Sequence, residues 1–370
     1  MAKYIHELAD WPSFTWDDAM LSAPLAALRY DQGRLIGRME NLGFDLKREA
    51  MLQTLTQDVV KSSEIEGEIL DNNQVRSSIA RRLGLEIAGS VNSERHVDGV
   101  VEMMVDATQR YEAPLTDMRL FGWHAALFPT GFSGMYKITV GTWRTAEAGP
   151  MQVVSGAMGK EHVHYEAPEA ARLSADMTTF LAWVNDNNKI DPVVKAAIAH
   201  LWFVTIHPFD DGNGRIARAI ADMQLARADG SPYRFYSMSS QIRTKRKEYY
   251  EILEKTQKGS LDITPWIVWF LHCLSEAIAS SDTVLKSVLA KSRFWESQRD
   301  HALNARQRSM LNRLIDGFEG KLTSSKWAKI TKSSQDTAGR DIQDLIEKGL
   351  LVKDEGGGRS TSYSLTPQHS

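Results

Sequence analysis

The chain has 370 residues, of which 42% are hydrophobic and 25% charged, and its formal net charge at pH 7 is -3. This composition indicates a soluble globular protein of two or three domains and gives no general attraction to nucleic acid. The first residues hold no apolar run of signal-peptide length, and no later segment approaches the roughly 18 apolar residues of a membrane span. We therefore expect a cytoplasmic protein without membrane association.

The N-terminal portion, from Trp11 to about Leu42, is predicted to be helical. Its apolar residues recur at spacings that suit helices packed on a core: Ala19, Met20, Leu25, Leu28, Leu35 and Ile36. The sequence contains no internal repeat. The region leads directly into the next helical segment.

A second helical pattern runs from Asp45 to Ile65. One stripe of this helix holds, at intervals of three and four, Leu52, Leu55, Val59, Ser62 and Glu66. A carboxylate that continues an apolar face is costly unless a cation meets it, so Glu66 predicts a partner arginine elsewhere in the fold. The alternative is that the helix has ended and Glu66 is solvated.

Two short β-prone segments, 141–145 and 151–156, are separated by glycine and proline and predict a β-hairpin. Beyond them, His162 and His164 stand at strand spacing, which puts two imidazoles on one face. A metal site would need further ligands, and no nearby cysteine or obvious third ligand is present. Packing or surface histidines are therefore favoured.

The most specific part of the sequence follows a helix that begins at Asp191-Pro192, an N-cap and a proline in the first helical position. This helix should end near Ile206. His207 precedes a proline and is therefore expected at the mouth of a loop. The loop and the start of the next helix are His207-Pro208-Phe209-Asp210-Asp211-Gly212-Asn213-Gly214-Arg215-Ile216-Ala217-Arg218.

These twelve residues combine a titratable base, a carboxylate and two cations at a helix N-terminus, where a phosphate chain is favourably held. Arg215 and Arg218 share one helical face and suit phosphate oxygens, while Asp211 offers a hard oxygen ligand for magnesium. With His207 as base, the set suits in-line attack on a nucleotide phosphate. The alternative, a capped helix with surface ion pairs, is disfavoured because eight fixed positions arise by chance in fewer than about one in a million such chains.

The string matches the signature of the Fic family, His-x-Phe-x-(Asp/Glu)-Gly-Asn-Gly-Arg-x-x-Arg, at every position. The resemblance implies an all-helical core that transfers AMP from ATP to a target hydroxyl. It implies His207 as the general base and Asp211 as the magnesium ligand. The nucleotide phosphates would be held by Gly212, Asn213, Gly214, Arg215, Ile216, Ala217 and Arg218.

The segment Ser62-Ser63-Glu64-Ile65-Glu66-Gly67 resembles the Fic inhibitory motif, (Ser/Thr)-x-x-x-Glu-(Gly/Asn), in the class with an N-terminal inhibitory helix. The resemblance implies that Glu66, with Ser62 and Gly67 in the same motif, pairs with Arg218 and denies ATP a productive γ-phosphate position. In some relatives the same glutamate supports removal of AMP from the target, and that second reaction stays open here.

Two further features gain meaning from the resemblance. The position of the hairpin resembles the Fic flap, so the target would be held by Val153, Val154, Ser155 and Gly156, with an ordinary edge hairpin as the alternative. In the helical segment 245–258, Tyr249 and Tyr250 resemble residues that shape the adenine and ribose pocket, although half-buried core tyrosines are the alternative. Gln257 stands where an asparagine is expected in that pocket.

Residues 301–370 hold 11 Lys and Arg against 8 Asp and Glu, and their pattern of three helices and a strand pair resembles a winged-helix domain. A DNA-binding regulator whose Fic portion senses nucleotide is therefore an alternative function. Its contacts would come from Lys332, Gln335, Arg340, Gln343 and, on the wing, Arg359. Because the excess of positive charge is small, a protein-protein or dimer module is favoured.

The sequence thus predicts a mainly α protein with a helical region at 1–95, a Fic-type core with a short β-hairpin flap at 96–290, and a winged-helix domain at 300–370. The inhibitory helix would cover about 45–66. The predicted function is that of an autoinhibited protein adenylyltransferase that uses magnesium and ATP on Ser, Thr or Tyr hydroxyls, with a homodimer expected from the resemblance. Cys273 is the only cysteine, so a buried thiol is expected.

Overall fold

The computed structural model describes residues 3–40, 44–87, 90–156, 162–187, 189–315, 318, 320–354 and 361–366. Within these ranges the protein is mainly helical, which confirms the predicted fold class. The helices are α1 (Asp18–Glu40), α2 (Phe44–Ile65), α3 (Asn72–Arg82), α4 (Arg95–Gln109), α5 (Asp117–Leu127), α6 (Leu173–Asn185), α7 (Pro192–Ile206), α8 (Asn213–Asp229), α9 (Met238–Thr244), α10 (Arg246–Gln257), α11 (Thr264–Ser297), α12 (Ala305–Ile315), α13 (Ser324–Thr331) and α14 (Gln335–Glu347). None of these helices has the length and apolar character needed to cross a bilayer.

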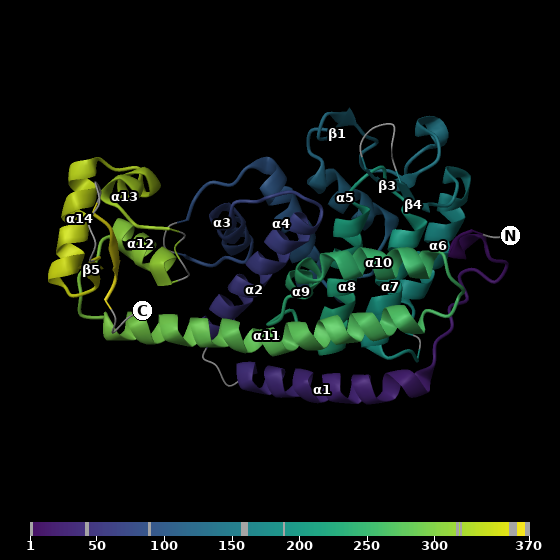
Figure 1. The fold of residues 1–370 in the computed structure, drawn as a ribbon, viewed down its shortest axis with the longest axis horizontal. Coiled ribbons are helices and arrows are strands. Elements are labelled where there is room, and N and C mark those ends of the chain that lie inside the picture. Colours follow the sequence, from purple (N-terminus) through teal and green to yellow (C-terminus); the bar gives the residue numbers. More distant parts are fainter. Residues whose placement is uncertain are drawn as a thin grey trace. The chain divides into compact units, whose positions relative to one another are not determined.

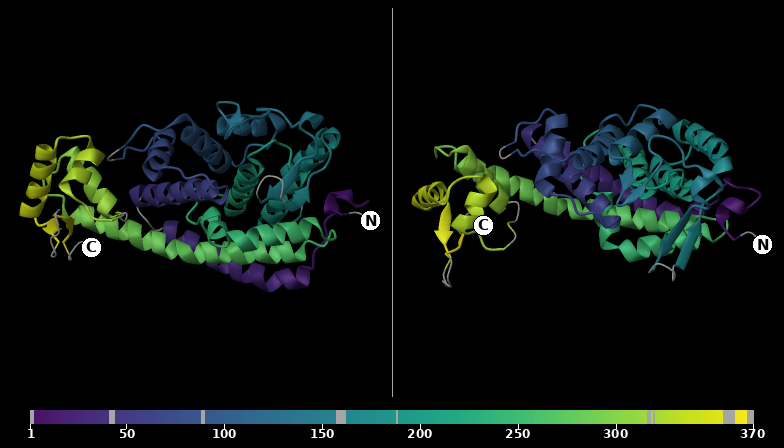
Figure 2. Two further views of the ribbon diagram at one scale, coloured as in Figure 1. Left: turned by 45° about the horizontal axis from the view of Figure 1, so that its top comes forward. Right: turned by 90° about the horizontal axis from the view of Figure 1, so that it is seen from above.

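Short strands form three antiparallel pairs in the described part of the chain. They are β1 (Phe132–Ser133) with β2 (Tyr136–Lys137), β3 (Gln152–Ser155) with β4 (His162–Glu166), and β5 (Leu351–Lys353) with β6 (Tyr363–Leu365). Figure 2 shows the β3–β4 pair projecting from the helices around it. Single turns of 3-10 helix lie at η1 (Ile5–Glu7), η2 (Ala146–Ala148) and η3 (Ala170–Arg172).

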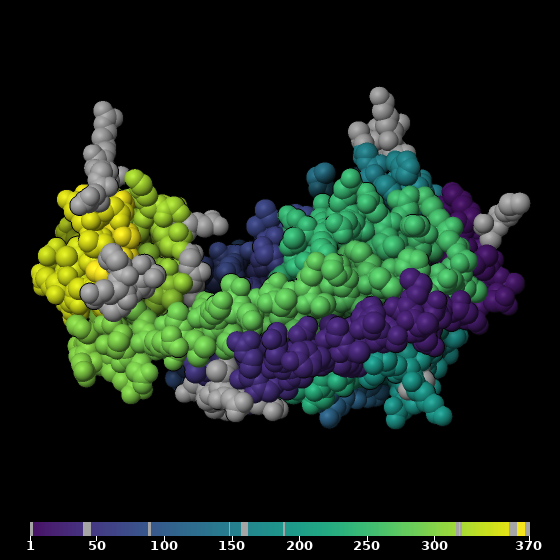
Figure 3. Space-filling model, turned by 60° about the horizontal axis from the view of Figure 1, so that its bottom comes forward, coloured from purple at the N-terminus to yellow at the C-terminus, as the bar shows by residue number. Residues whose placement is uncertain are grey.

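The chain divides into two compact units, of which the first comprises residues 1–83 and 92–282. Its centre is formed by α7 and α8 (Figure 1). The side chains of these two helices are almost all buried. α1 runs along the surface beside the first part of α11 (Figure 3), where the backbone N–H of Asp17 donates to Thr264 Oγ1 at one end and Arg38 pairs with Asp282 at the other. Helix α8, which carries most of the signature, thus lies inside this unit with most of its side chains buried.

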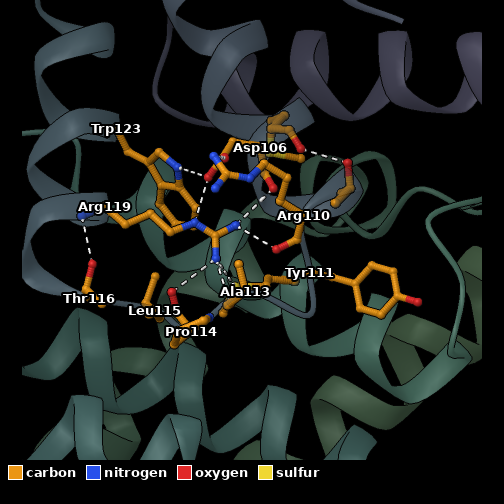
Figure 4. Close-up of polar contacts among 12 residues, drawn as sticks. Asp106, Arg110, Tyr111, Ala113, Pro114, Leu115, Thr116, Arg119 and Trp123 are labelled. Atoms are coloured by element: carbon orange, nitrogen blue, oxygen red, sulfur yellow. Dashed lines mark hydrogen bonds and ion pairs between the residues drawn. The ribbon is translucent and has the colours of Figure 1, made fainter.

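A polar network joins α4 to α5 and the loop between them (Figure 4). The Nε of Arg119 donates to Asp106 Oδ2 at 2.7 Å, and the indole N–H of Trp123 donates to the same oxygen at 2.8 Å. The Arg119 guanidinium also donates to the carbonyls of Asp106, Arg110 and Ala113. Because one arginine satisfies several loop carbonyls, the two helices that support α8 are fixed to each other.

The second unit comprises residues 84–91 and 283–370. Its helices α12, α13 and α14 pack with the β5–β6 pair around the fully buried Trp327. The order of three helices and a strand pair is the one that the sequence predicts. The glycine-rich turn from Glu355 to Arg359 lies outside the described residues, so the predicted wing contact of Arg359 stays a prediction.

The predicted hairpin partner of residues 151–156 is wrong. β3 pairs with β4, with Ser155 opposite His162, whereas residues 141–145 form no strand. The physical reason is Arg144, which is buried and donates through Nε to the carbonyl of His207 at 2.8 Å. This contact holds the 141–145 segment against the signature loop and away from β3. The β1–β2 pair was not predicted.

Candidate active site

His207 lies directly after the last residue of α7, in a left-handed backbone conformation with φ 51°. Helix α7 begins as the sequence predicts, because the Asp191 carboxylate accepts from the N–H of Val193 at 2.8 Å. The Nδ1 of His207 lies 3.1 Å from the carbonyl oxygen of Val204. A carbonyl only accepts, so Nδ1 donates and Nε2 keeps a lone pair. Burial lowers the pKa of His207, which favours this neutral form at pH 7.

The loop after His207 is closed by the side chain of Asn213. Its Oδ1 accepts from the N–H of Phe209 at 3.0 Å, and its Nδ2 donates to the carbonyl of Phe209 at 2.8 Å. Gly212 has φ 80°, and a Cβ there would lie 2.9 Å from Cε2 of Phe128. Asn213 therefore shapes the predicted phosphate loop with both ends of its amide, and Gly212 is required by backbone conformation and by space.

Asp211 is half-buried and lies at the loop surface, where its two carboxylate oxygens have different partners. Oδ1 accepts from the N–H of Gly212, and Oδ2 accepts from the hydroxyl of Ser133 on β1. Among the residues that the structure describes, no group of three or more His, Cys, Asp or Glu side chains is arranged to hold a metal ion. Asp211 thus offers one half-buried carboxylate at the turn into α8, while the neighbouring Asp210 accepts from the N–H of Thr139 at 2.8 Å.

The two arginines of the signature are both buried and both engaged. Arg218 donates through Nε to Ser62 Oγ and through Nη2 to the Ser62 carbonyl, each at 2.9 Å. Its Nη2 also lies 2.8 Å from Glu66 Oε1. Ile216 and Ala217, between the arginines, are buried in the helix packing. The Nη1 of Arg218 has no hydrogen-bond partner within the described ranges.

Glu66 lies just beyond the end of α2, in a turn that brings it back to α8. Helix α2 ends at Ile65, and Gly67 takes a left-handed conformation with φ 87°. The N–H of Glu68 then donates to the carbonyl of Ser63 at 3.0 Å, which closes a helix-ending turn. Both sequence alternatives therefore hold in part: the helix has ended, and the Glu66 carboxylate, 32% exposed, still meets an arginine.

The Glu66 carboxylate also lies against the first turn of α8. A Cβ at Gly214 would clash with Glu66 Oε1, so the carboxylate approaches the backbone closely there. Unpaired N–H groups and the helix dipole make this end favourable for negative charge. The carboxylate thus occupies a place where an anion is stabilised.

Sequence reasoning missed Glu68. Its Oε2 lies 2.8 Å from Nη1 of Arg215, whose guanidinium also lies over the Phe128 ring at 5.1 Å. The available signal was a second acidic residue two positions after Glu66, across the turn glycine. Nothing in the signature itself points to such a partner for Arg215.

Helix α10 contributes three predicted nucleotide residues with different surroundings. Tyr249 is fully buried, with its hydroxyl 3.1 Å from Nε2 of His200, whereas Tyr250 is exposed and lies near Glu66. Gln257 is buried, and its Nε2 lies 3.4 Å from Thr205 Oγ1 on the last turn of α7. Tyr250 is therefore the member of the three that faces open space beside the signature.

The β3–β4 pair is anchored beside His207. The Tyr165 hydroxyl on β4 donates to the carbonyl of Thr205 at 2.6 Å, and Arg144 bridges the carbonyls of His207 and Pro168. Val153 is half-buried, whereas Val154 and Ser155 are exposed on β3, which has one open edge in the described sheet. The fourth predicted flap residue, Gly156, is exposed directly after the end of β3.

The two strand histidines do lie side by side, with ring centroids 4.5 Å apart. The partners of His164 are the Ser155 hydroxyl at 2.6 Å and the Glu254 carboxylate at 2.6 Å. These contacts link the hairpin to α10. They account for His164 by hydrogen bonding, in keeping with the favoured alternative to a metal site.

Residues 114–225 match the sequence profile of the Fic/DOC family, and residues 4–85 match a family described as a domain of unknown function, DUF4172. The protein adenylyltransferase fic-1 of Caenorhabditis elegans is 27% identical over 251 residues, which are 65% of this chain and 45% of that protein. Its counterpart in Caenorhabditis briggsae is 30% identical over 224 residues, 60% of this chain and 40% of that protein. The chain thus spans less than half the length of these curated relatives.

Solved structures extend the likeness to the fold. A Fic family protein from Desulfovibrio desulfuricans is 22% identical and covers 96% of this chain and 98% of its own, with a TM-score of 0.52. A fragment of fic-1 from Caenorhabditis elegans is 22% identical and covers 73% of this chain and 75% of its own, with a TM-score of 0.50. The profile match over α5 to α8 thus identifies residues 114–225 as a Fic/DOC domain, and the likeness to the solved structures shows that the chain shares their fold.

Proposed function

We propose that the protein is an autoinhibited protein adenylyltransferase, which transfers AMP from ATP to a Ser, Thr or Tyr hydroxyl of a target protein. The observation that carries the proposal is the start of α8, where a neutral His207 lies before a helix N-terminus with two buried arginines. Both arginines are held by carboxylates, so the site is built for anions. Relatives named as protein adenylyltransferases support the same activity.

The chemistry would proceed as follows. His207 Nε2 takes the proton of the target hydroxyl, whose oxygen attacks the α-phosphorus of ATP. The bond from the α-phosphorus to the bridging oxygen of the β-phosphate breaks, and pyrophosphate leaves with the electron pair. The open edge of β3, at Val154 and Ser155, would hold the target segment by strand addition.

Magnesium fits this site as part of the substrate complex. Asp211 supplies one half-buried carboxylate at the loop surface, and a Mg²⁺ ion bound mainly by nucleotide phosphates and water needs only one or two such ligands. The ion would neutralise phosphate charge as pyrophosphate departs. Ser133, which donates to Asp211, would keep that carboxylate turned toward the loop.

The contacts of Arg218 also suggest how the enzyme would be inhibited. Arg218 holds Glu66 and Ser62 at once, and a γ-phosphate would have to displace the carboxylate from Nη2. Because 32% of the Glu66 side chain is exposed, water can take over its hydration when it leaves. Glu66 therefore competes with ATP for Arg218. A further proposal is that Glu66 also supports removal of AMP from the target.

The test is to incubate wild type, Glu66→Gly and His207→Ala with ATP, GTP, UTP and CTP, each labelled in the α-phosphate, together with cell lysate. Mass spectrometry then locates the modified residues. We expect strong AMP labelling by Glu66→Gly, weak labelling by wild type and none by His207→Ala. Labelling by His207→Ala equal to that of Glu66→Gly would show that the assigned base is wrong.

DNA binding by the second unit is not favoured. The exposed face of α14 offers Gln335, Arg340 and Gln343, but the helix as a whole carries one arginine and four carboxylates. This charge would repel the phosphate backbone. A protein-protein or dimer contact remains our proposal for the unit.

A further inference from the structure

The turn after α2 carries two carboxylates that reach α8, and each holds a different arginine of the signature. Glu66 pairs with Arg218, and Glu68 pairs with Arg215 at 2.8 Å between Oε2 and Nη1. Gly67, between them, has φ 87°, so the chain reverses and both side chains point to the same helix end. The turn is held from α10 as well, because Arg246 Nε donates to the Ile65 carbonyl at 2.7 Å.

We propose that Glu68 is a positioning residue that restrains Arg215 and weakens nucleotide binding, in addition to the restraint of Arg218 by Glu66. The inference rests on the proposed function. It concerns a residue outside the inhibitory motif and an arginine that the motif leaves unpaired. Release of Glu66 alone would then leave half of the phosphate site restrained.

The geometry at Arg215 supports this role. The Arg215 side chain is only 8% exposed and lies over the Phe128 ring, so its guanidinium has little freedom to turn. Nη1 is engaged by Glu68, while Nε has no hydrogen-bond partner among the described residues. A phosphate gains most from two parallel N–H groups of one arginine, and Glu68 occupies one end of the fork.

Charge acts in the same direction. Glu68 places a negative charge beside an arginine that is expected to meet a triphosphate, and like charges repel in a partly dehydrated site. The Glu68 side chain is 36% exposed, so it can leave Arg215 for water. Glu68 makes no contact with His207, and its effect should therefore fall on the KM for ATP and leave kcat nearly unchanged.

The experiment compares Glu66→Gly/His207→Ala with Glu66→Gly/His207→Ala/Glu68→Gln, in which no turnover disturbs binding. Calorimetric titration with Mg-ATP should give a Kd about three- to tenfold lower for the Glu68→Gln protein, the range expected for a partly exposed charge pair beside a phosphate site. In the His207-containing proteins, Glu68→Gln should lower the KM for ATP by a similar factor and change kcat by less than about twofold.

Glu64→Gln is the matched control. Glu64 lies in the last turn of α2, and its partners are Lys61 and Arg243, neither of which lies on α8. This change should leave the Kd and KM of the Glu66→Gly background unaltered. Thermal unfolding within about 2 °C of the background would show that each variant is folded.

An unchanged or higher Kd with Glu68→Gln, in a Glu66→Gly background that binds Mg-ATP, overturns this inference alone. Failure of the Glu66→Gly/His207→Ala protein to bind any nucleotide overturns the proposed function and this inference with it.

Discussion

Two arginine–carboxylate pairs lie on or beside α8, about one helical turn apart, and they differ in what surrounds them. Arg218 pairs with Glu66, whose side chain is 32% exposed, at the mouth of the signature loop. Asp222, which lies four residues after Arg218, pairs with Arg234. The side chains of Asp222 and Arg234 are each at most 1% exposed. The same two chemical groups thus form a pair at the surface of the site and a pair in the core.

The surroundings decide which pair can open. When Glu66 leaves Arg218, water can solvate the carboxylate and a phosphate can replace it on the arginine. When Asp222 loses Arg234, a carboxylate stays in a dehydrated place beside the buried Asp58. The first pair is therefore suited to a switch, and the second to a permanent link between α8 and the segment before α9.

The largest expected effect comes from Arg234→Met, which removes the cation of the core pair. Asp222 and Asp58 would be left buried together, and breaking such a pair costs about 3–5 kcal/mol of unfolding free energy. Urea denaturation at pH 7 measures the loss, with Glu66→Gly as the control that opens the other pair at a cost below about 1 kcal/mol. Equal losses in the two variants would contradict the distinction between the pairs.

A pH-dependent effect should follow from Asp58→Asn. Burial, aided by the charge of Asp222, raises the pKa of Asp58 to about 7, so folding favours its protonated form. Protonated Asp58 therefore contributes its full stabilisation of the wild type below pH 3.8, and this stabilisation is lost as the pH rises through about 7. Relative to wild type, Asp58→Asn should gain about 3.5 kcal/mol of stability between pH 4 and pH 7.5, since folding raises the pKa from 3.8 to about 7 and each pKa unit corresponds to about 1.36 kcal/mol. Urea denaturation across this range checks it, and a constant difference would contradict it.

A smaller effect is expected from Gly67→Ala. The left-handed backbone at Gly67 disfavours a side chain, so the change should cost about 1 kcal/mol of stability and displace the turn that carries Glu66 and Glu68. Labelling activity should rise. Gly230→Ala, at the left-handed end of α8 with open space around it, should cost a similar stability without changing activity. The same change in labelling by both variants would show that the turn has no special role.

The sequence predicts those parts of the site that depend on local pattern. The N-cap of α7, the end of that helix at Ile206 and the start of α8 at Asn213 follow from capping residues, proline and glycine. The apolar stripe of α2 likewise indicates a cation facing Glu66. These features were accessible because each is encoded within a few residues.

The remaining parts depend on residues that are far apart in the chain. The contact of Arg144 with the His207 carbonyl spans 63 positions, and that of Glu68 with Arg215 spans 147. Each of these charged residues is indistinguishable in sequence from an ordinary surface charge. The pairing of β3 with β4 was missed for the same reason, since the role of Arg144 in holding residues 141–145 is visible only in three dimensions.

If Glu66 competes with ATP for Arg218, the competition should be visible in the initial rate of AMP transfer at a fixed Mg-ATP concentration, measured for wild type and Glu66→Gly. In Glu66→Gly the nucleotide phosphates can form a charge-assisted contact with Arg218, which is worth about 1.5–3 kcal/mol, so the rate should be at least about tenfold higher than in wild type. Equal rates in the two proteins would show that Glu66 does not compete with ATP for Arg218.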